Sequence, residues 1–351
     1  MKRILKSSRF WGLLIALALL AFCVKDIRAS DVRSLCERVQ WEYVLPSIGA
    51  AIIFVVARAF RWKVIIAQQA RIGYGKVVAL YSAGQVVNMA MPALTGQVGR
   101  LIVLSRKMAL SKTYVFSTLV LEVLFDALSL IFFMLVTSLV FAFPSKYRTA
   151  SILVAVGTLF ILIVLYLIIS YQQNIEETCR RRLSKRWPGA YITIKKAIRS
   201  FVKGINMLKS SQHVAGSMIL SLISWTCHVL AIWFLFKSFG FQLPVPAAAV
   251  VMIINTLVLM IPITPGNAGT FEVAVSTSLA AMSVGRSDAV LFALALHLLD
   301  LLPIVIMGAW FFRFEKVSLR EIEKEHEDEI IFEKISEDGT FIEEDKPKRP
   351  R

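Results

Sequence analysis

The sequence predicts an all-α integral membrane protein with about six transmembrane helices and two re-entrant hairpins in an inverted repeat. Three observations predict this fold. The chain has a mean hydropathy of +0.66, and 18% of its 351 residues are charged, against about 25% in soluble proteins. Apolar runs long enough to cross a bilayer recur along the chain. Two further apolar segments contain glycine and proline at corresponding places in the two halves.

Six apolar runs are predicted to cross the membrane, because about 20 apolar residues span its hydrocarbon core. They are residues 10–24, 43–67, 117–143, 149–171, 214–236 and 289–312. The first run also has the layout of a secretory signal, but no clear small-residue cleavage site follows it, so we interpret it as an uncleaved span.

The chain divides into a membrane domain and a charged tail. The membrane domain is predicted over residues 1–314, with halves of about 1–148 and 149–314. The segment 315–351 holds 13 acidic and 8 basic residues, which gives it a net charge of −5. We expect it to be a solvated cytoplasmic tail.

The two broken segments cover residues 77–103 and 247–284. Proline and glycine free backbone groups that hydrocarbon cannot satisfy, so such backbone must be buried in protein or line a wet cavity. We therefore expect each segment to enter the membrane and return as a hairpin. The alternative, that each segment crosses fully, stays open.

Basic residues orient the bundle. The net charge is +16, and the bases flank apolar spans, so membrane topology and anionic lipid explain them better than nucleic acid. The N-terminus and the loop 180–209 are strongly basic and are predicted to be cytoplasmic. Bases also flank the first broken segment on both sides, among them Arg58, Arg61 and Lys107, whereas the second has few charges nearby. The first hairpin is therefore predicted to enter from the cytoplasm and the second from outside, although Lys146 and Arg148 fit this plan poorly.

The loop 190–209 has apolar residues at helical spacing and bases on another face. This pattern is typical of an interfacial helix on anionic lipid. It is equally typical of an amphipathic connector packed on the bundle, and both interpretations stay open.

No metal, cofactor or enzyme signal stands out. The four cysteines are scattered without a paired motif, and the four histidines do not cluster. The sequence has no Gly-rich phosphate loop before a helix and no evident nucleophile–base pair. We expect no cofactor and no catalysis.

Ionisable and amide side chains in the first half are candidates for function, because they are costly inside a membrane. Arg100 follows the broken backbone, and its guanidinium can grip a phosphate through two hydrogen bonds. Gln85 and Asn88 share a helix face. They would either bind a lipid headgroup or form hydrogen bonds to a neighbouring helix. Glu122 and Asp126 are four residues apart in an apolar span. We expect them to face the interior, where they would pair with Arg100 or Arg58 or exchange protons.

The second half offers a comparable set. A helix is predicted to start near Asn267 or Thr270, and its first amides would favour an anion. Glu272 lies in that first turn, so it either caps the helix or serves charge balance and proton coupling. His297 and Asp300 share a face of the last span, where a proton relay or interhelical polar bonding is expected. The span 214–236 carries a polar stripe at helical spacing, which we expect to form a packing seam against another helix. The stripe consists of Ser217, Ser221, Ser224 and His228.

Three motifs resemble those of the lysylphosphatidylglycerol synthase transmembrane-region family, a flippase-like membrane domain. The family pattern P-G-R-L-G-E-x-x-R is matched at Pro92, Gly96 and Arg100, whereas Ala93, Leu94, Thr95 and Gln97 depart from it. The pattern E-R-x-x-D is present without its arginine, at Glu122 and Asp126. The pattern P-G-x-x-G-x-x-E is complete, at Pro265, Gly266, Gly269 and Glu272.

The resemblance implies an inner-membrane domain that moves lipids or lipid-linked headgroups between leaflets. We expect a multi-pass protein of the bacterial inner membrane with both termini in the cytoplasm. Its expected partners are an anionic phospholipid or lipid-linked sugar and enzymes of lipid or envelope biosynthesis. We expect the substrate site at Arg100, Gln85, Asn88, Pro92, Gly96, Pro265, Gly266, Gly269 and Thr270. The alternative is a membrane enzyme, or an accessory subunit, of lipid headgroup or glycolipid assembly.

Overall fold

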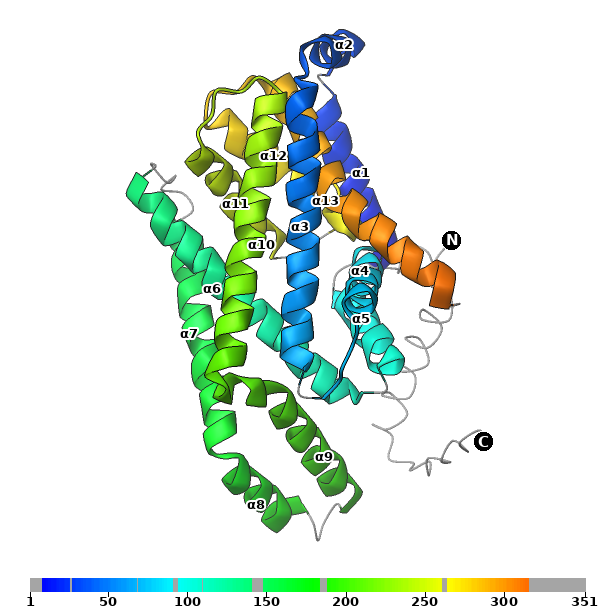
Figure 1. The fold of residues 1–351 in the computed structure, drawn as a ribbon, viewed down its shortest axis with the longest axis vertical. Helices are drawn as coiled ribbons and strands as arrows, with labels where there is room; N and C mark the ends of the chain where they lie inside the picture. The colour runs from blue at the N-terminus through cyan, green and yellow to red at the C-terminus, as the bar shows by residue number, and fades with distance from the viewer. Residues whose placement is uncertain are drawn as a thin grey trace.

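The computed structural model describes residues 8–25, 27–67, 69–90, 94–108, 110–140, 148–183, 188–260 and 264–315. Every regular element in this part of the chain is a helix, so the predicted all-α class is confirmed there (Figure 1). The predicted acidic tail lies almost wholly outside the described residues, as does Pro92.

The helices follow one another with short connections. The helices of the first half are α1 (Ser8–Val24), α2 (Ala29–Arg38), α3 (Trp41–Ile66), α4 (Tyr74–Ala90), α5 (Leu94–Lys107) and α6 (Lys112–Val140). Those of the second half are α7 (Arg148–Ser170), α8 (Gln172–Leu183), α9 (Pro188–Ile205), η2 (Asn206–Lys209), α10 (Ser211–Ser238), α11 (Val245–Leu259), η3 (Pro265–Asn267), α12 (Thr270–Ala280) and α13 (Arg286–Glu315).

Within the described ranges, four helices are long and apolar enough to cross a membrane: α3, α6, α10 and residues 286–310 of α13. They coincide with four of the six predicted spans. The described apolar parts of α1 and α7 are shorter, at Leu14–Val24 and Ala155–Ser170, so these two spans stay predictions. Large apolar side chains are exposed along the long helices, such as Leu45 on α3 and Leu139 on α6. Exposed apolar surface of this extent is typical of helices that face lipid.

The paired helices α3 and α10 run side by side through the middle of the bundle (Figure 1). The three serines of the predicted seam, Ser217, Ser221 and Ser224, are all fully buried, and Ser221 accepts a hydrogen bond from Arg61 on α3. Ser47 on α3 also donates a hydrogen bond to the carbonyl oxygen of Ala231 on α10, over 2.7 Å. Small and hydroxylated residues at such a contact let two helix backbones approach closely.

The two broken segments form pairs of short helices. In the first pair α4 contacts α5, and in the second α11 contacts α12. The longest of these helices is α4, which has 17 residues and rises about 26 Å at 1.5 Å per residue. It is therefore shorter than the hydrocarbon core of a bilayer, which is about 30 Å thick. The ends of the pairs meet, because η3 packs on α4 and a side chain added at Gly266 would lie 3.9 Å from the carbonyl oxygen of Met89.

The packing of these pairs is crossed between the halves. In the first half α5 packs on α6, and in the second α12 packs on α13. In addition, α4 of the first half packs on α13 of the second, and α11 of the second half packs on α6 of the first. Each short pair therefore contacts the last long helix of its own half and that of the other half.

Helix α9 packs on the bundle through its apolar face. Val202 and Ile205 are buried, and a side chain at Gly204 would clash with Ser117 on α6. Lys196, Arg199 and Lys203 remain exposed on another face. The connector interpretation of this loop is therefore correct for its apolar face, and the basic face is left for solvent or lipid headgroups.

The predicted entry sides of the two hairpins give a direct test. In a chain without its four native cysteines, Lys76→Cys and Lys107→Cys should both react with a membrane-impermeant maleimide only from the cytoplasmic side. Gln242→Cys, in the exposed loop before α11, should react only from the opposite side. Labelling of positions 76 and 107 from different sides would show that the first segment crosses fully.

Candidate functional site

A buried ion cluster joins α3, α5 and α6 inside the bundle. We define it as Arg58, Arg61, Arg100, Glu122 and Asp126. Arg100 donates to Glu122 over 2.6 Å, and Arg61 donates to Asp126 over 2.7 Å. Arg58 also bonds to Asp126 and lies 4.0 Å from Glu122. The predicted inward orientation of the two acids and their pairing with Arg100 and Arg58 are therefore confirmed.

Helical periodicity puts these groups on facing surfaces. Glu122 and Asp126 are one turn apart on α6, and Arg58 and Arg61 are one turn apart on α3, so each pair lies on one face. Arg61 is fully buried and Arg100 is 4% exposed. Arg58 and Arg61 are among the bases predicted to flank the first broken segment, but both lie within α3 and bond to Asp126.

Neutral polar groups complete the cluster. Tyr81 donates to Glu122 over 2.9 Å and accepts a hydrogen bond from Gln85 over 2.7 Å. Trp225 on α10 donates to Asp126 over 3.0 Å. Gln85, predicted to read a headgroup, is thus part of the hydrogen-bond network of Glu122. Asn88 is half-buried one turn further along α4.

The cluster carries more positive than negative charge. Three guanidinium groups face two carboxylates, so the described ionic groups leave one positive charge uncompensated. Four buried guanidinium nitrogens also have no hydrogen-bond partner among the described residues, namely Nε of Arg58, Nε and Nη2 of Arg61, and Nε of Arg100. A buried charge without a partner is costly, so this arrangement favours an added anion.

The second half holds a smaller polar group at the start of α12. Glu272 accepts a hydrogen bond from the backbone N–H of Gly269 over 2.7 Å, and its other oxygen lies 2.7 Å from Nδ1 of His297. Nε2 of His297 lies 3.0 Å from the carbonyl oxygen of Gly266, and the imidazole stacks on Phe271. The predicted helix start at Thr270 and the capping role of Glu272 are both confirmed.

The backbone before α12 explains why glycine is needed here. Gly266 and Gly269 have φ of 58° and 83°, in the region that glycine adopts without strain. A side chain at Gly269 would also lie 2.5 Å from Cβ of Leu19 on α1. Both glycines therefore shape the turn that brings Glu272 to His297. Thr270 donates to the carbonyl oxygen of Asn267 over 2.8 Å, and a phosphate role for it stays a prediction.

A third polar pair joins α10 to α13. Nε2 of His228 lies 3.2 Å from the carboxylate of Asp300, and the imidazole stacks on Phe54 of α3. His297 and Asp300 therefore each bond to another helix, which confirms the interhelical interpretation of both. His228 was assigned only to a packing seam by its sequence spacing, which gives no sign of a partner 72 residues away.

Comparison with known proteins places this architecture in a family. Residues 9–308 match the model of the lysylphosphatidylglycerol synthase TM region. The chain belongs to this family. The match covers every helix that contributes to the three polar groups, and the expected family resemblance is thereby confirmed.

The chain is also similar to three proteins named as UPF0104 membrane proteins. The chain is similar to one from Methanocaldococcus jannaschii, with 25% identity over 76% of this chain and 83% of the relative. It is also 23% identical to one from Pyrococcus horikoshii, over 73% of this chain and 82% of that protein. A third, from Methanothermobacter thermautotrophicus, is 21% identical over 74% of this chain and 81% of the relative.

The family motifs occupy the polar groups just described. Glu122 and Asp126 of the E-R-x-x-D pattern are the two acids of the buried ion cluster, and Arg100 is one of its bases. Val123, which stands where that pattern has arginine, is 57% exposed on the outer face of α6. Arg58 and Arg61 on α3 lie in none of these patterns, yet they supply two of the three guanidinium groups.

Proposed function

We propose that this membrane protein moves an anionic lipid, or a polyprenyl-phosphate-linked glycolipid, between the leaflets of the inner (plasma) membrane. The observation that carries the proposal is the uncompensated positive charge of the buried ion cluster. A lipid phosphate supplies the missing negative charge, and its oxygens accept hydrogen bonds from the unpartnered guanidinium nitrogens. The lipid tail stays in the bilayer.

The arrangement of the short helices supports movement. Each hairpin packs on the last long helix of both halves, and the hairpin ends meet at η3 and the end of α4. This crossed pattern is what an inverted repeat produces, and in secondary transporters one repeat rocks against the other around a site near the midplane. In this proposal the hairpins enter from opposite sides and expose the ion cluster to each leaflet in turn.

Polar groups also occupy related places in the two halves. In the first half, Arg100 of a hairpin bonds to Glu122 of the last long helix. In the second half, Glu272 of a hairpin bonds to His297 of the last long helix. The second half is therefore suited to proton exchange and the first to phosphate binding, because imidazole and carboxyl groups can each hold or release a proton, whereas guanidinium grips phosphate through two hydrogen bonds.

Arg100 is the first residue to test. Arg100→Ala should slow the movement of fluorescent phosphatidylglycerol across reconstituted vesicles by about tenfold or more, since a charge-assisted hydrogen bond is worth about 1.5–3 kcal/mol. Arg100→Lys should recover only part of the rate, because ammonium lacks the planar fork of guanidinium. Arg33→Ala is the control, since Arg33 is exposed on α2.

The outcome separates transport from the enzymatic alternative. Full transport by a folded Arg100→Ala variant would remove Arg100 from the site. The proposal includes no catalytic step, so purified protein should form no new lipid in a headgroup-transfer assay. Formation of a modified lipid would favour an enzyme of headgroup assembly instead.

A further inference from the structure

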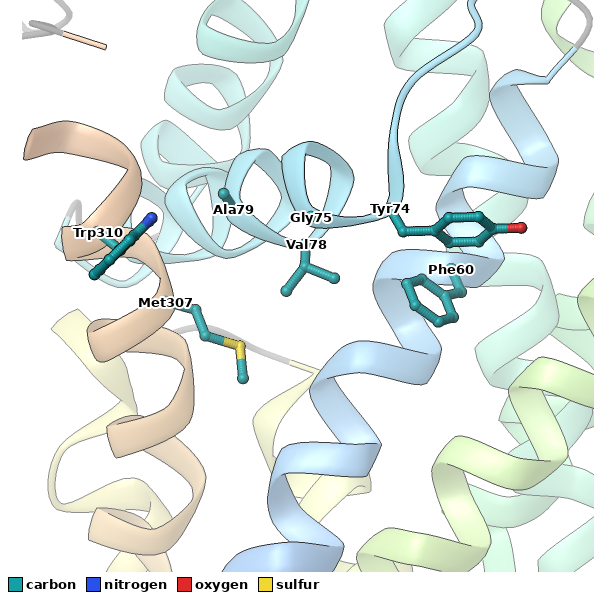
Figure 2. A pocket seen from close by; sticks show the side chains of 7 residues that line it. All are labelled: Phe60, Tyr74, Gly75, Val78, Ala79, Met307 and Trp310. Carbon is teal, nitrogen blue, oxygen red and sulfur yellow. The ribbon is translucent and has the colours of Figure 1, made fainter. Parts of the chain in front are cut away.

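A groove of about 320 Å³ opens on the outer surface of the bundle between α3, α4 and α13. Its walls are apolar and aromatic. Figure 2 shows Val78 on α4 between Met307 of α13 and Phe60 of α3, with Trp310 and Tyr74 at the two ends. Sites for small ligands usually enclose about 300–1,000 Å³ and are mostly apolar. The groove therefore has the size and lining to hold part of a lipid chain.

A second hollow of about 330 Å³ lies beside the groove, at the loop between α3 and α4. Lys63 and Arg71 line it, and its other lining residues are small or apolar. The side chain of Tyr74, which lines the groove, contacts one lining residue of each hollow. Its ring meets Phe60 edge-on at 5.1 Å on the side of the groove, and Nζ of Lys63 lies 3.2 Å from its centre.

The order of these groups matches the order of groups in a phospholipid. Apolar side chains line the groove, the exposed ring of Tyr74 follows at one end of it, and two bases lie beyond that ring. Tyr74 is 64% exposed, and tyrosine is enriched at the membrane–water interface. Lysine and arginine just beyond this level attract anionic headgroups.

We propose that this double hollow binds one anionic phospholipid from the surrounding leaflet. The phosphate lies between Lys63 and Arg71, Tyr74 packs beside the glycerol region, and one acyl chain lies along Val78 and Met307. The site is separate from the buried ion cluster. It does not depend on the proposed transport, because a lipid bound here can support the fold or regulate the protein without crossing the membrane.

Glycine at position 75 allows the apolar half to be tested alone. Gly75 lines the groove, and a side chain added there would meet no atom within 4 Å. Gly75→Trp therefore fills the groove without a clash at its Cβ. Gly49→Trp is the matched control, because position 49 on α3 is equally open and lies outside the groove.

The measurement is native mass spectrometry of the full chain, titrated with dimyristoyl phosphatidylglycerol or with phosphatidylcholine of the same chains. Wild type should bind the anionic lipid more tightly. Lys63→Gln and Arg71→Gln should each weaken that binding about fivefold, since a base near the surface contributes about 1 kcal/mol. Arg33→Gln is the control, because Arg33 is exposed on α2 and pairs with Glu37. Gly75→Trp should weaken binding of both lipids, and Gly49→Trp should change neither.

Unchanged preference for phosphatidylglycerol in the Lys63 and Arg71 variants would overturn the proposal. So would unchanged binding in Gly75→Trp, or a dimer of wild type that Gly75→Trp abolishes, since a second copy would then fill the groove. Arg71 is exposed, so its variant tests the site even where Lys63→Gln does not fold. The lipid-binding measurement does not involve transport, so a negative result would not contradict the proposed transport. In the same way, normal transport by Arg100→Ala would not contradict this lipid site.

Discussion

Glu122→Gln is expected to lower the free energy of unfolding by about 3–5 kcal/mol, the usual cost of removing one partner from a buried ion pair. Glu122 is 4% exposed and accepts hydrogen bonds from Arg100 and Tyr81. It also lies 3.8 Å from a second guanidinium, that of Arg61. The substitution leaves three guanidinium groups with one carboxylate. The amide nitrogen of the new glutamine is a hydrogen-bond donor, and it would face Arg100 or Tyr81, which are donors themselves.

Thermal and denaturant unfolding in detergent measures this effect. Glu42→Gln, at an exposed position in the first turn of α3, should change stability by less than about 0.5 kcal/mol. The double variant Arg100→Gln with Glu122→Gln should be more stable than Glu122→Gln alone, because it restores the original surplus of one positive charge. A single variant as stable as wild type would show that the ion cluster is not held together by Glu122.

Glu272→Gln is expected to leave a folded protein that still binds lipid but transports it at least about tenfold more slowly, with a flattened dependence on pH. Both nitrogens of His297 face acceptors, the carboxylate of Glu272 and the carbonyl oxygen of Gly266. A neutral imidazole has one N–H. Glu272 and His297 therefore make both hydrogen bonds only when the two side chains together carry one additional proton. That proton lies either on the imidazole or on the carboxyl group.

Glutamine keeps the shape of Glu272 and still accepts the hydrogen bond from Gly269, but it cannot take up or release that proton. The measurement is transport into vesicles with an imposed proton gradient, at several pH values. Asp288→Asn in the first turn of α13 is the control, because Asp288 is partly exposed and pairs with Arg38. If transport responds neither to the gradient nor to Glu272→Gln, the coupling role is wrong and Glu272 only caps α12.

Helix positions follow from the sequence because they depend on local properties of the chain. Length and hydropathy located α3, α6, α10 and α13. Glycine and proline located the turn at residues 265–269, since glycine, which has no Cβ, tolerates the positive φ found at Gly266 and Gly269. The inward orientation of Glu122 and Asp126 also followed, because a carboxylate facing hydrocarbon is costly wherever it occurs.

Partners could not be predicted in the same way, because they depend on how separate helices are rotated and packed. In the sequence, Arg61 is a base near the end of an apolar run, and nothing there indicates its partner. Only the packing of α3 on α6 brings it to Asp126, which is 65 residues away. The groove at Val78 and Met307 likewise exists only because α4 crosses α13. The sequence by itself determined where the long apolar helices lie, where the backbone breaks and which charges need partners, but it gave no prediction of α2 or α8. The tertiary structure alone decided which partner each charge received, since helical periodicity fixes the faces of one helix but not its rotation against another.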